Sequence, residues 1–163
     1  MAGKRRAAGG TPATVALASA GIAYTLRVYE HRPSAAAYGL EAAEALGVDP
    51  ARVFKTLLVE SEAGLAVGIV PADRQLALKA IAAVLGSKRA GMADPRLAER
   101  TTRYVVGGIS PIGQRTPLPT VLDGSAAAFE TILVSGGKRG LDLELSPADL
   151  VAVTGAVVSD IAR

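Results

Sequence analysis

Cysteine is absent from this chain of 163 residues, and histidine occurs only once, as His31. The absence of cysteine excludes disulfides, thiolate metal sites and a cysteine nucleophile. A single histidine argues against a histidine metal site and against a catalytic triad built on a histidine base. Aromatic residues make up 4% of the chain, which argues against a surface that stacks single-stranded bases. We therefore expect neither a metal nor a cofactor.

Long apolar runs are also missing. Glycine, proline or a charged residue interrupts each run well short of the roughly 20 residues that a membrane-spanning helix needs. The basic start of the chain, Met-Ala-Gly-Lys-Arg-Arg, is followed by a capped amphipathic helix and not by the apolar stretch of a secretion signal. These features predict a soluble cytoplasmic protein with no membrane partner.

The length fits one domain that buries a core of its own. We expect residues 1–10, which are small and basic, to form a disordered tail, and residues 11–163 to form the domain. The formal charge of +3 is carried mostly by arginine, which suits contacts with phosphate. This mild excess permits an RNA partner without requiring one, so any recognition of RNA should be local.

Capping residues placed before proline mark helix starts in this chain. They occur at Thr11-Pro12, Asp49-Pro50, Asp94-Pro95 and Ser146-Pro147. Helices are predicted at residues 11–20, 40–46, 76–85, 95–101, 126–129 and 147–154. Strands are predicted at residues 24–29, 53–61, 65–70, 120–123, 131–135 and 141–145, with an antiparallel hairpin across residues 62–64. This order of elements predicts a single α/β (α+β) domain with a mixed sheet.

The clearest strand signal is the sequence Val-Phe-Lys-Thr-Leu-Leu-Val at residues 53–59. Both faces of this strand are apolar, so we expect it to be covered on both sides, with Lys55 opening into a pocket. Lysine is almost never fully buried without a partner, and an ammonium group against apolar walls would bind an anion or a carbonyl. The alternative is that Lys55 is a solvated residue of an edge strand.

Three loops are rich in glycine, at residues 107–111, 112–114 and 135–140. A pair of glycines lets backbone N–H groups approach a ligand, and such amides can hold a carbonyl, an oxyanion or a phosphate. Each loop can also be read as an ordinary tight turn. None of them matches the glycine patterns that bind nucleoside triphosphates or dinucleotides.

Asp142 follows the third glycine loop, and strand alternation places it on the same face as Glu144. Two carboxylates in this arrangement can act as an acid and base pair or can simply face water, and by themselves they favour the solvated interpretation. His31 precedes a turn, and we expect it at the surface or at a pocket rim.

Several segments together resemble one known family. They are Val-Tyr-Glu-His (28–31), Val-Phe-Lys-Thr-Leu-Leu-Val (53–59), Met-Ala-Asp-Pro (92–95), Val-Gly-Gly-Ile-Ser-Pro-Ile-Gly-Gln (106–114), Leu-Pro-Thr (118–120) and Val-Ser-Gly-Gly-Lys-Arg-Gly-Leu-Asp (134–142). In this order they resemble the YbaK/EbsC family of bacterial aminoacyl-tRNA deacylases, from about Tyr24 to Arg163. The family implies a strongly bent mixed sheet, partly barrel-like, that is surrounded by helices.

The resemblance also implies a function and a site. The function is hydrolytic clearance, in trans, of tRNA(Pro) mischarged with cysteine, in association with prolyl-tRNA synthetase. The catalytic positions carried over from the family are Lys55, Gly107 and Gly108. The substrate-binding positions are Tyr29, Tyr38, Thr56, Ile109, Ser135, Gly136 and Asp142. Tyr38 stands where the family pattern leads us to expect phenylalanine, which would change the polarity of the pocket rim.

The family also implies a mechanism that suits the side chains available. The chain offers no nucleophile at a motif, whereas a cysteinyl ester carries a thiol placed to attack its own carbonyl carbon. The amides around Gly108 would stabilise the oxyanion or hold the aminoacyl group, and Asp142 would orient the amino group or a pocket loop. Two alternatives remain open: a deacylase for another mischarged tRNA, such as Ala-tRNA(Pro), and a non-catalytic module that binds tRNA or a nucleotide.

Overall fold

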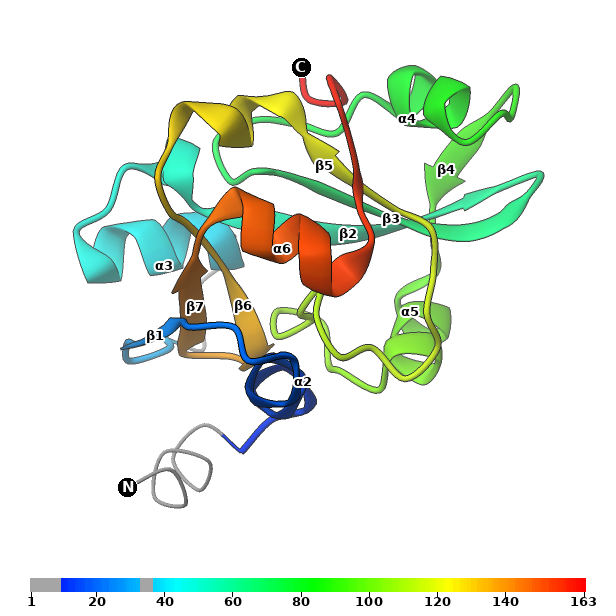
Figure 1. Ribbon diagram of the computed structural model, residues 1–163. Coiled ribbons are helices and arrows are strands. Elements are labelled where there is room, and N and C mark those ends of the chain that lie inside the picture. Colours follow the sequence, from blue (N-terminus) through cyan, green and yellow to red (C-terminus); the bar gives the residue numbers. More distant parts are fainter. Residues whose placement is uncertain (1–9, 33–36) are drawn as a thin grey trace.

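The computed structural model describes residues 10–32 and 37–163, so the predicted tail, apart from Gly10, lies outside the described residues (Figure 1). The α-helices are α2 (Pro12–Ala20), α3 (Tyr38–Leu46), α4 (Leu78–Val84), α5 (Pro95–Thr102) and α6 (Pro147–Thr154). The strands are β1 (Thr25–Val28), β2 (Phe54–Ser61), β3 (Gly64–Pro71), β4 (Ala90–Met92), β5 (Thr120–Asp123), β6 (Ile132–Lys138), β7 (Leu141–Leu145) and β8 (Val157–Ser159). The 3-10 helices are η1 (Pro50–Arg52) and η2 (Gly124–Ala128). None of the described helices is long and apolar enough to cross a membrane.

The strands form two sheets, which confirms a mixed α/β fold. One sheet has the order β1-β7-β6 and is antiparallel. The other has the order β4-β2-β3-β5-β8, in which β3, β5 and β8 run parallel and the β2–β3 hairpin is antiparallel, as predicted. A parallel bridge between Val53 and Leu133 joins the two sheets. The result is a bent, partly barrel-like arrangement surrounded by helices (Figure 1).

The main core lies between the two sheets, and it contains Phe54 and Leu58 of β2. The opposite face of β2 contributes Val59 to a second core, which α4 covers through Ile81. A third cluster packs α3 against the bridge between the sheets. The prediction that β2 is covered on both faces is therefore confirmed.

Capping chemistry explains where the helices begin. The side chains of Thr11, Asp94 and Ser146 accept hydrogen bonds from backbone N–H groups in the first turns of α2, α5 and α6. Asp49 caps in the same way, so the predicted helix start at Asp49-Pro50 is confirmed, although the helix that follows is only the short 3-10 helix η1. Val53 enters the strand path directly afterwards, which leaves no room for a longer helix.

Three further differences concern short elements. The predicted α-helix at residues 126–129 is the 3-10 helix η2. The strands β4 and β8 were not predicted, because each has only three residues and neither shows the alternation of a half-buried strand. They lie at the two edges of the larger sheet, where β4 pairs with β2 and β8 pairs with β5. Local sequence does not reveal these pairings.

Candidate active site

A cavity of about 370 Å³ opens where β2, α3, the β4–α5 connection and the glycine loop after α5 meet. Its walls are mainly apolar, and its polar groups come from separate elements. Eight of the ten residues singled out in the sequence line it: Tyr29, Tyr38, Lys55, Thr56, Gly107, Ile109, Ser135 and Asp142. Gly108 and Gly136 do not line it.

Lys55 lies on β2 opposite Val70 of β3, in the half of β2 that β4 does not pair with. It is half-buried and lines the cavity, so the alternative of a solvated edge residue does not fit the structure. Burial lowers the pKa of Lys55, and the negative charge of Asp73 partly opposes this shift. Within the described residues no carboxylate lies within ion-pair distance of its ammonium group. The ammonium group is therefore available to an anion or a carbonyl in the cavity.

Asp142 lies on β7 and is only 5% exposed, so the solvated interpretation of this carboxylate is wrong. Burial raises the pKa of Asp142 to about 7, and the positive charge of Arg27 opposes part of this rise. The guanidinium of Arg27 instead contacts Glu144, which also accepts a hydrogen bond from Arg52 at 3.1 Å. In the part of the chain that the structure describes, no hydrogen-bond donor reaches the Asp142 carboxyl group. The two carboxylates therefore differ: Glu144 is paired, and Asp142 faces the cavity unpaired.

Thr56 contributes a polar edge to the same cavity. Its Oγ1 is buried and finds no hydrogen-bond partner among the described residues. The carbonyl of Val53 accepts a hydrogen bond from Ala72 N–H of the neighbouring chain segment. Hydrogen-bonded and non-hydrogen-bonded pairs alternate along an antiparallel ladder, and Thr56 is three residues further on, in a non-hydrogen-bonded pair with Ile69. The N–H and C=O groups of Thr56 therefore point away from β3. Further along, this outer edge of β2 is occupied, because the carbonyl of Leu58 accepts a hydrogen bond from Ala93 N–H.

The loop after α5 approaches the cavity closely because Gly107 has no side chain. Gly107 has a φ of +88°, and a Cβ there would lie 2.7 Å from the ring of Tyr38. The loop is held by Glu99, which accepts a hydrogen bond from Val106 N–H at 2.8 Å. Among the described residues, the N–H groups of Gly107 and Ile109 donate no hydrogen bond. These two amides can therefore bind an oxygen of a ligand.

Gly108 has a different role from the predicted one. Its N–H donates to the carbonyl of Val105 at 2.8 Å, so this amide is already used in a turn. A Cβ at Gly108 would lie 2.8 Å from the Cα of Lys138, so glycine is needed here for two loops to pack. The N–H of Gly108 itself is thus not free for a ligand, so the prediction that the amides around Gly108 hold the oxyanion or the aminoacyl group now concerns its neighbours Gly107 and Ile109.

Gly136 is also a packing residue. A Cβ there would lie 2.7 Å from the side chain of Leu141, and its carbonyl accepts a hydrogen bond from Thr11 Oγ1 at 2.6 Å. It therefore fixes α2 to β6 behind the cavity. Its neighbour Ser135 does line the cavity, although its Oγ also accepts a hydrogen bond from Gly137 N–H at 3.2 Å.

The two tyrosines form part of the wall, and Tyr38 lies beside Arg139, which sequence reasoning missed, and beside His31, which was expected at the surface or at a pocket rim. Burial, together with the charge of Asp142, raises the pKa of Tyr29 to about 12. The guanidinium of Arg139 lies 5.2 Å from the centre of the Tyr38 ring and also donates to the carbonyl of Val106. His31 contacts the other side of this region: its Nδ1 lies 2.8 Å from Glu41, and its ring lies 5.9 Å from that of Tyr38. Arg139 belongs to the third glycine motif, which was the only signal for it.

The cavity thus combines an ammonium group, an unpaired carboxyl group and two free amides within apolar walls. Known proteins match both the sequence and the fold. Residues 33–153 match the family model described as the aminoacyl-tRNA editing domain. The chain belongs to this family. It is therefore an aminoacyl-tRNA deacylase, an enzyme that cleaves the ester between an amino acid and tRNA.

Individual relatives agree with this family. EbsC of Enterococcus faecalis, provisionally named a Cys-tRNA(Pro)/Cys-tRNA(Cys) deacylase, is 38% identical over 120 residues, which cover 73% of each chain. The uncharacterised protein YwhH of Bacillus subtilis is 32% identical over 111 residues, which cover 68% of this chain and 70% of YwhH. A crystal structure provisionally described as a trans-editing enzyme for prolyl-tRNA synthetase has a TM-score of 0.82 and 26% identity, and covers 93% of this chain and 95% of that one.

Proposed function

We propose that this deacylase removes cysteine from mischarged tRNA(Pro), and that the thiol of the substrate is the nucleophile. The observation that carries the proposal is the pair of unpartnered groups, Lys55 and Asp142, on the wall of one apolar cavity. An aminoacyl ester at the end of tRNA has the matching charges: an α-ammonium group at one end and phosphates at the other. The names of EbsC and of the similar crystal structure support the same RNA.

Each polar group of the cavity has a role in this proposal. Asp142 binds the α-ammonium group, which supplies the cation that the buried carboxylate lacks. Lys55 binds the phosphate and ribose of the terminal adenosine, and Thr56 accepts or donates a hydrogen bond at the same end. The free amides of Gly107 and Ile109 hold the ester carbonyl oxygen as it becomes an oxyanion. Tyr29, Tyr38 and Ser135 complete the wall around the aminoacyl group.

The reaction needs no nucleophile from the protein. The cysteinyl sulfur attacks the ester carbonyl carbon, the bond from this carbon to the ribose oxygen breaks, and the thiol proton moves to that oxygen. The products are uncharged tRNA and a cysteine thiolactone, which water then hydrolyses to cysteine. Positioning and oxyanion stabilisation can lower the barrier by roughly 7–11 and 3–4 kcal/mol in favourable cases.

A panel of esters tests the nucleophile. tRNA(Pro) charged with cysteine, serine or alanine presents side chains of similar size that differ in nucleophilicity, so a substrate-assisted reaction cleaves the cysteinyl ester at least tenfold faster. Equal rates for the cysteinyl and alanyl esters would show that water is the nucleophile, and a faster alanyl ester would favour the alanyl specificity instead. Binding of all three esters with no cleavage would support a non-catalytic module.

The same proposal places the enzyme in the cytoplasm, beside prolyl-tRNA synthetase. Because the mischarged tRNA is released by the synthetase, an editing enzyme that acts in trans gains from meeting it there. Co-migration of the chain with the synthetase and tRNA(Pro) in gel filtration tests this association, and the same run without the tRNA is its control.

A further inference from the structure

We infer that three arginines on the outer face of α5 form the surface that holds the RNA duplex next to the acylated end, an inference that rests on the proposed function. We call Arg96, Arg100 and Arg103 the arginine stripe. At about 100° per residue, Arg96 and Arg100 lie about 40° apart on α5, and Arg103 follows as the residue that ends the helix. The buried residues Ala98 and Thr102 lie on the opposite face, so the arginine stripe points to solvent.

The arginine stripe has one sign of charge. All three side chains are exposed, and within the described residues none has a carboxylate within ion-pair distance. The acidic residue of the helix, Glu99, uses its carboxylate to hold Val106 N–H, and Asp94 uses its own to cap the helix at Arg96 N–H. The stripe is therefore free to bind phosphate, for which the planar guanidinium is well suited.

Arg103 occupies a backbone position that normally requires glycine. Its φ is +67°, and it is the only non-glycine residue with a positive φ in the described part of the chain. The helices α2, α3 and α6 end in the same conformation with Gly21, Gly47 and Gly155. A side chain with a Cβ is strained in this region, so folding alone favours glycine at position 103.

Local electrostatics disfavour Arg96, whereas Arg100 and Arg103 lie at the C-terminal end of α5, where the helix dipole favours a cation. Arg96 lies in the first turn of α5, near the positive end of the helix dipole, where a cation is unfavourable. Arg96 and Arg100 are four residues apart, a spacing at which like charges repel. Two of the three arginines thus stand where helix formation would select another residue, and an anionic partner accounts for both.

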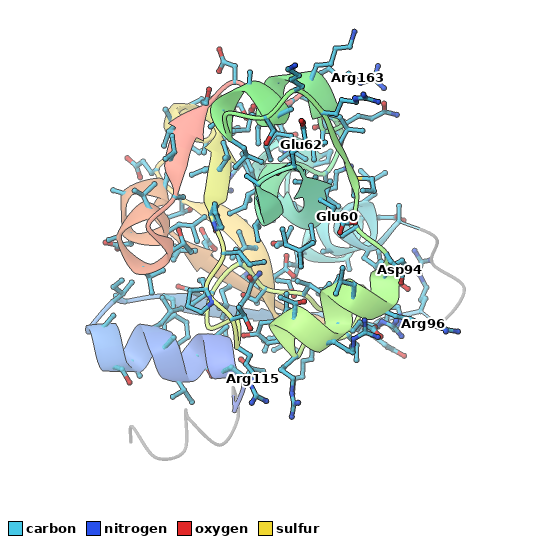
Figure 2. All side chains as sticks on the ribbon, turned by 90° about the vertical axis from the view of Figure 1, so that its right-hand side faces the viewer. Glu60, Glu62, Asp94, Arg96, Arg115 and Arg163 are labelled. Carbon is cyan, nitrogen blue, oxygen red and sulfur yellow. The ribbon has the colours of Figure 1, made fainter. Side chains whose placement is uncertain are left out.

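The position of the stripe relative to the cavity identifies this partner. The inner face of α5 forms part of the cavity wall through Pro95 and Ala98. A helix is about 10–12 Å across, so an RNA end that enters the cavity beside α5 brings the adjoining duplex to its outer face. In Figure 2, Arg96 lies near the first turn of α5, and Arg115, whose N–H donates to the carbonyl of Thr102, lies near the last turn. Arg115 is exposed and extends the basic surface.

The test compares two triple variants of equal charge. The stripe variant carries Arg96→Gln, Arg100→Gln and Arg103→Gly. The control carries Lys88→Gln, Arg89→Gln and Arg163→Gln, which are exposed residues outside α5; Arg163 lies at the opposite edge of the molecule in Figure 2. The affinity for uncharged tRNA(Pro) is measured from about 50 to 300 mM salt. Deacylation is measured on cysteinyl-tRNA(Pro) and on cysteinyl-adenosine, which reaches the cavity without any duplex.

Each lost phosphate contact should reduce the slope of log affinity against log salt by about 0.9, which is roughly eightfold in affinity per decade of salt. Relative to 1 M salt, three lost contacts should therefore weaken the binding of tRNA(Pro) by the stripe variant roughly five-hundredfold near 0.1 M salt, while its turnover of cysteinyl-adenosine stays that of the parent. Unchanged affinity, or an equal loss in the control, would overturn the inference. A variant that keeps its tRNA affinity but no longer co-migrates with the synthetase would overturn it in favour of a protein partner.

A single substitution separates binding from structure. Arg103→Gly should raise the midpoint of thermal unfolding, because glycine relieves the backbone strain, and should still weaken tRNA binding several-fold. If it stabilises the chain and leaves the salt slope unchanged, Arg103 has no RNA contact. A parent chain that cleaves neither cysteinyl substrate would refute the proposed function, whereas an active parent with an unaffected stripe variant refutes this inference alone.

Discussion

Replacing Asp142 by asparagine should change how the stability of the domain depends on pH. The pKa of Asp142 is about 7 in the folded chain, against an ordinary value of 3.8, because burial disfavours the charged form. Since the folded state holds this proton more tightly than the unfolded state, stability falls as the pH rises from about 4 to 7. At about 1.36 kcal/mol per pKa unit, the loss amounts to about 4 kcal/mol above pH 7.

Asparagine cannot ionise, so the variant should lack this loss. Urea unfolding of parent and variant at several pH values between 4 and 8 measures the difference in their free energies of unfolding. The variant should gain stability relative to the parent with rising pH, and the gain should level off above pH 7. Glu144→Gln is the matched control, because hydrogen bonds from Thr131 and contacts with Arg27 lower the pKa of Glu144 and reverse the expected trend. A difference between Asp142→Asn and parent that stays constant with pH would refute the reasoning.

Three further predictions concern the cavity wall and the loop packed beside it. Lys55→Ala should lower the rate of deacylation of cysteinyl-tRNA(Pro) at least a hundredfold with little loss of stability. The control Lys79→Ala, on the exposed side of α4, should change neither the rate nor the stability. A Lys55→Ala rate within a few fold of the parent would contradict the role of Lys55. Thr56→Val removes a buried hydroxyl without a partner, so we expect urea unfolding to show a gain of about 1 kcal/mol and the deacylation assay a severalfold loss. Gly108→Ala should lower the free energy of unfolding by about 1–3 kcal/mol and reduce turnover, because the added Cβ would lie 2.8 Å from the backbone of Lys138. Normal turnover and an unchanged free energy of unfolding would show that the loop adapts to the side chain.

The sequence predicted those elements whose boundaries depend on local chemistry. The strands β5 and β7 and the helix α6 have the predicted bounds, since turn residues, Ser146-Pro147 and the glycine at 155 mark them. Elements without such markers were missed. Ala90–Met92 becomes β4 only because it pairs with the far end of β2. Tertiary pairing, and not the propensity of Ala, Gly and Met, decides that segment.

The candidate site divides in a similar way. Motifs identified eight residues that the fold brings to one cavity, but they could not say which glycines face it and which serve packing. Gly107 and Gly108 are adjacent in the chain, and only the positions of Tyr38 and Lys138 distinguish their roles. Strand alternation likewise placed Asp142 and Glu144 on one face without showing that Arg27 and Arg52 reach only the second.

Three groups that disfavour folding lie together on the cavity wall. Asp142 and Lys55 are each less easily charged there than in water, and the Thr56 hydroxyl has no described partner. A domain selected for stability alone would replace such groups with apolar residues, since buried polar atoms without partners cost free energy. Their presence on one wall means that the missing partners come together, in one ligand that has a cation, an anion and a hydrogen-bonding group. An aminoacyl-tRNA end is such a ligand, and its binding should raise the midpoint of thermal unfolding of the parent more than that of Asp142→Asn.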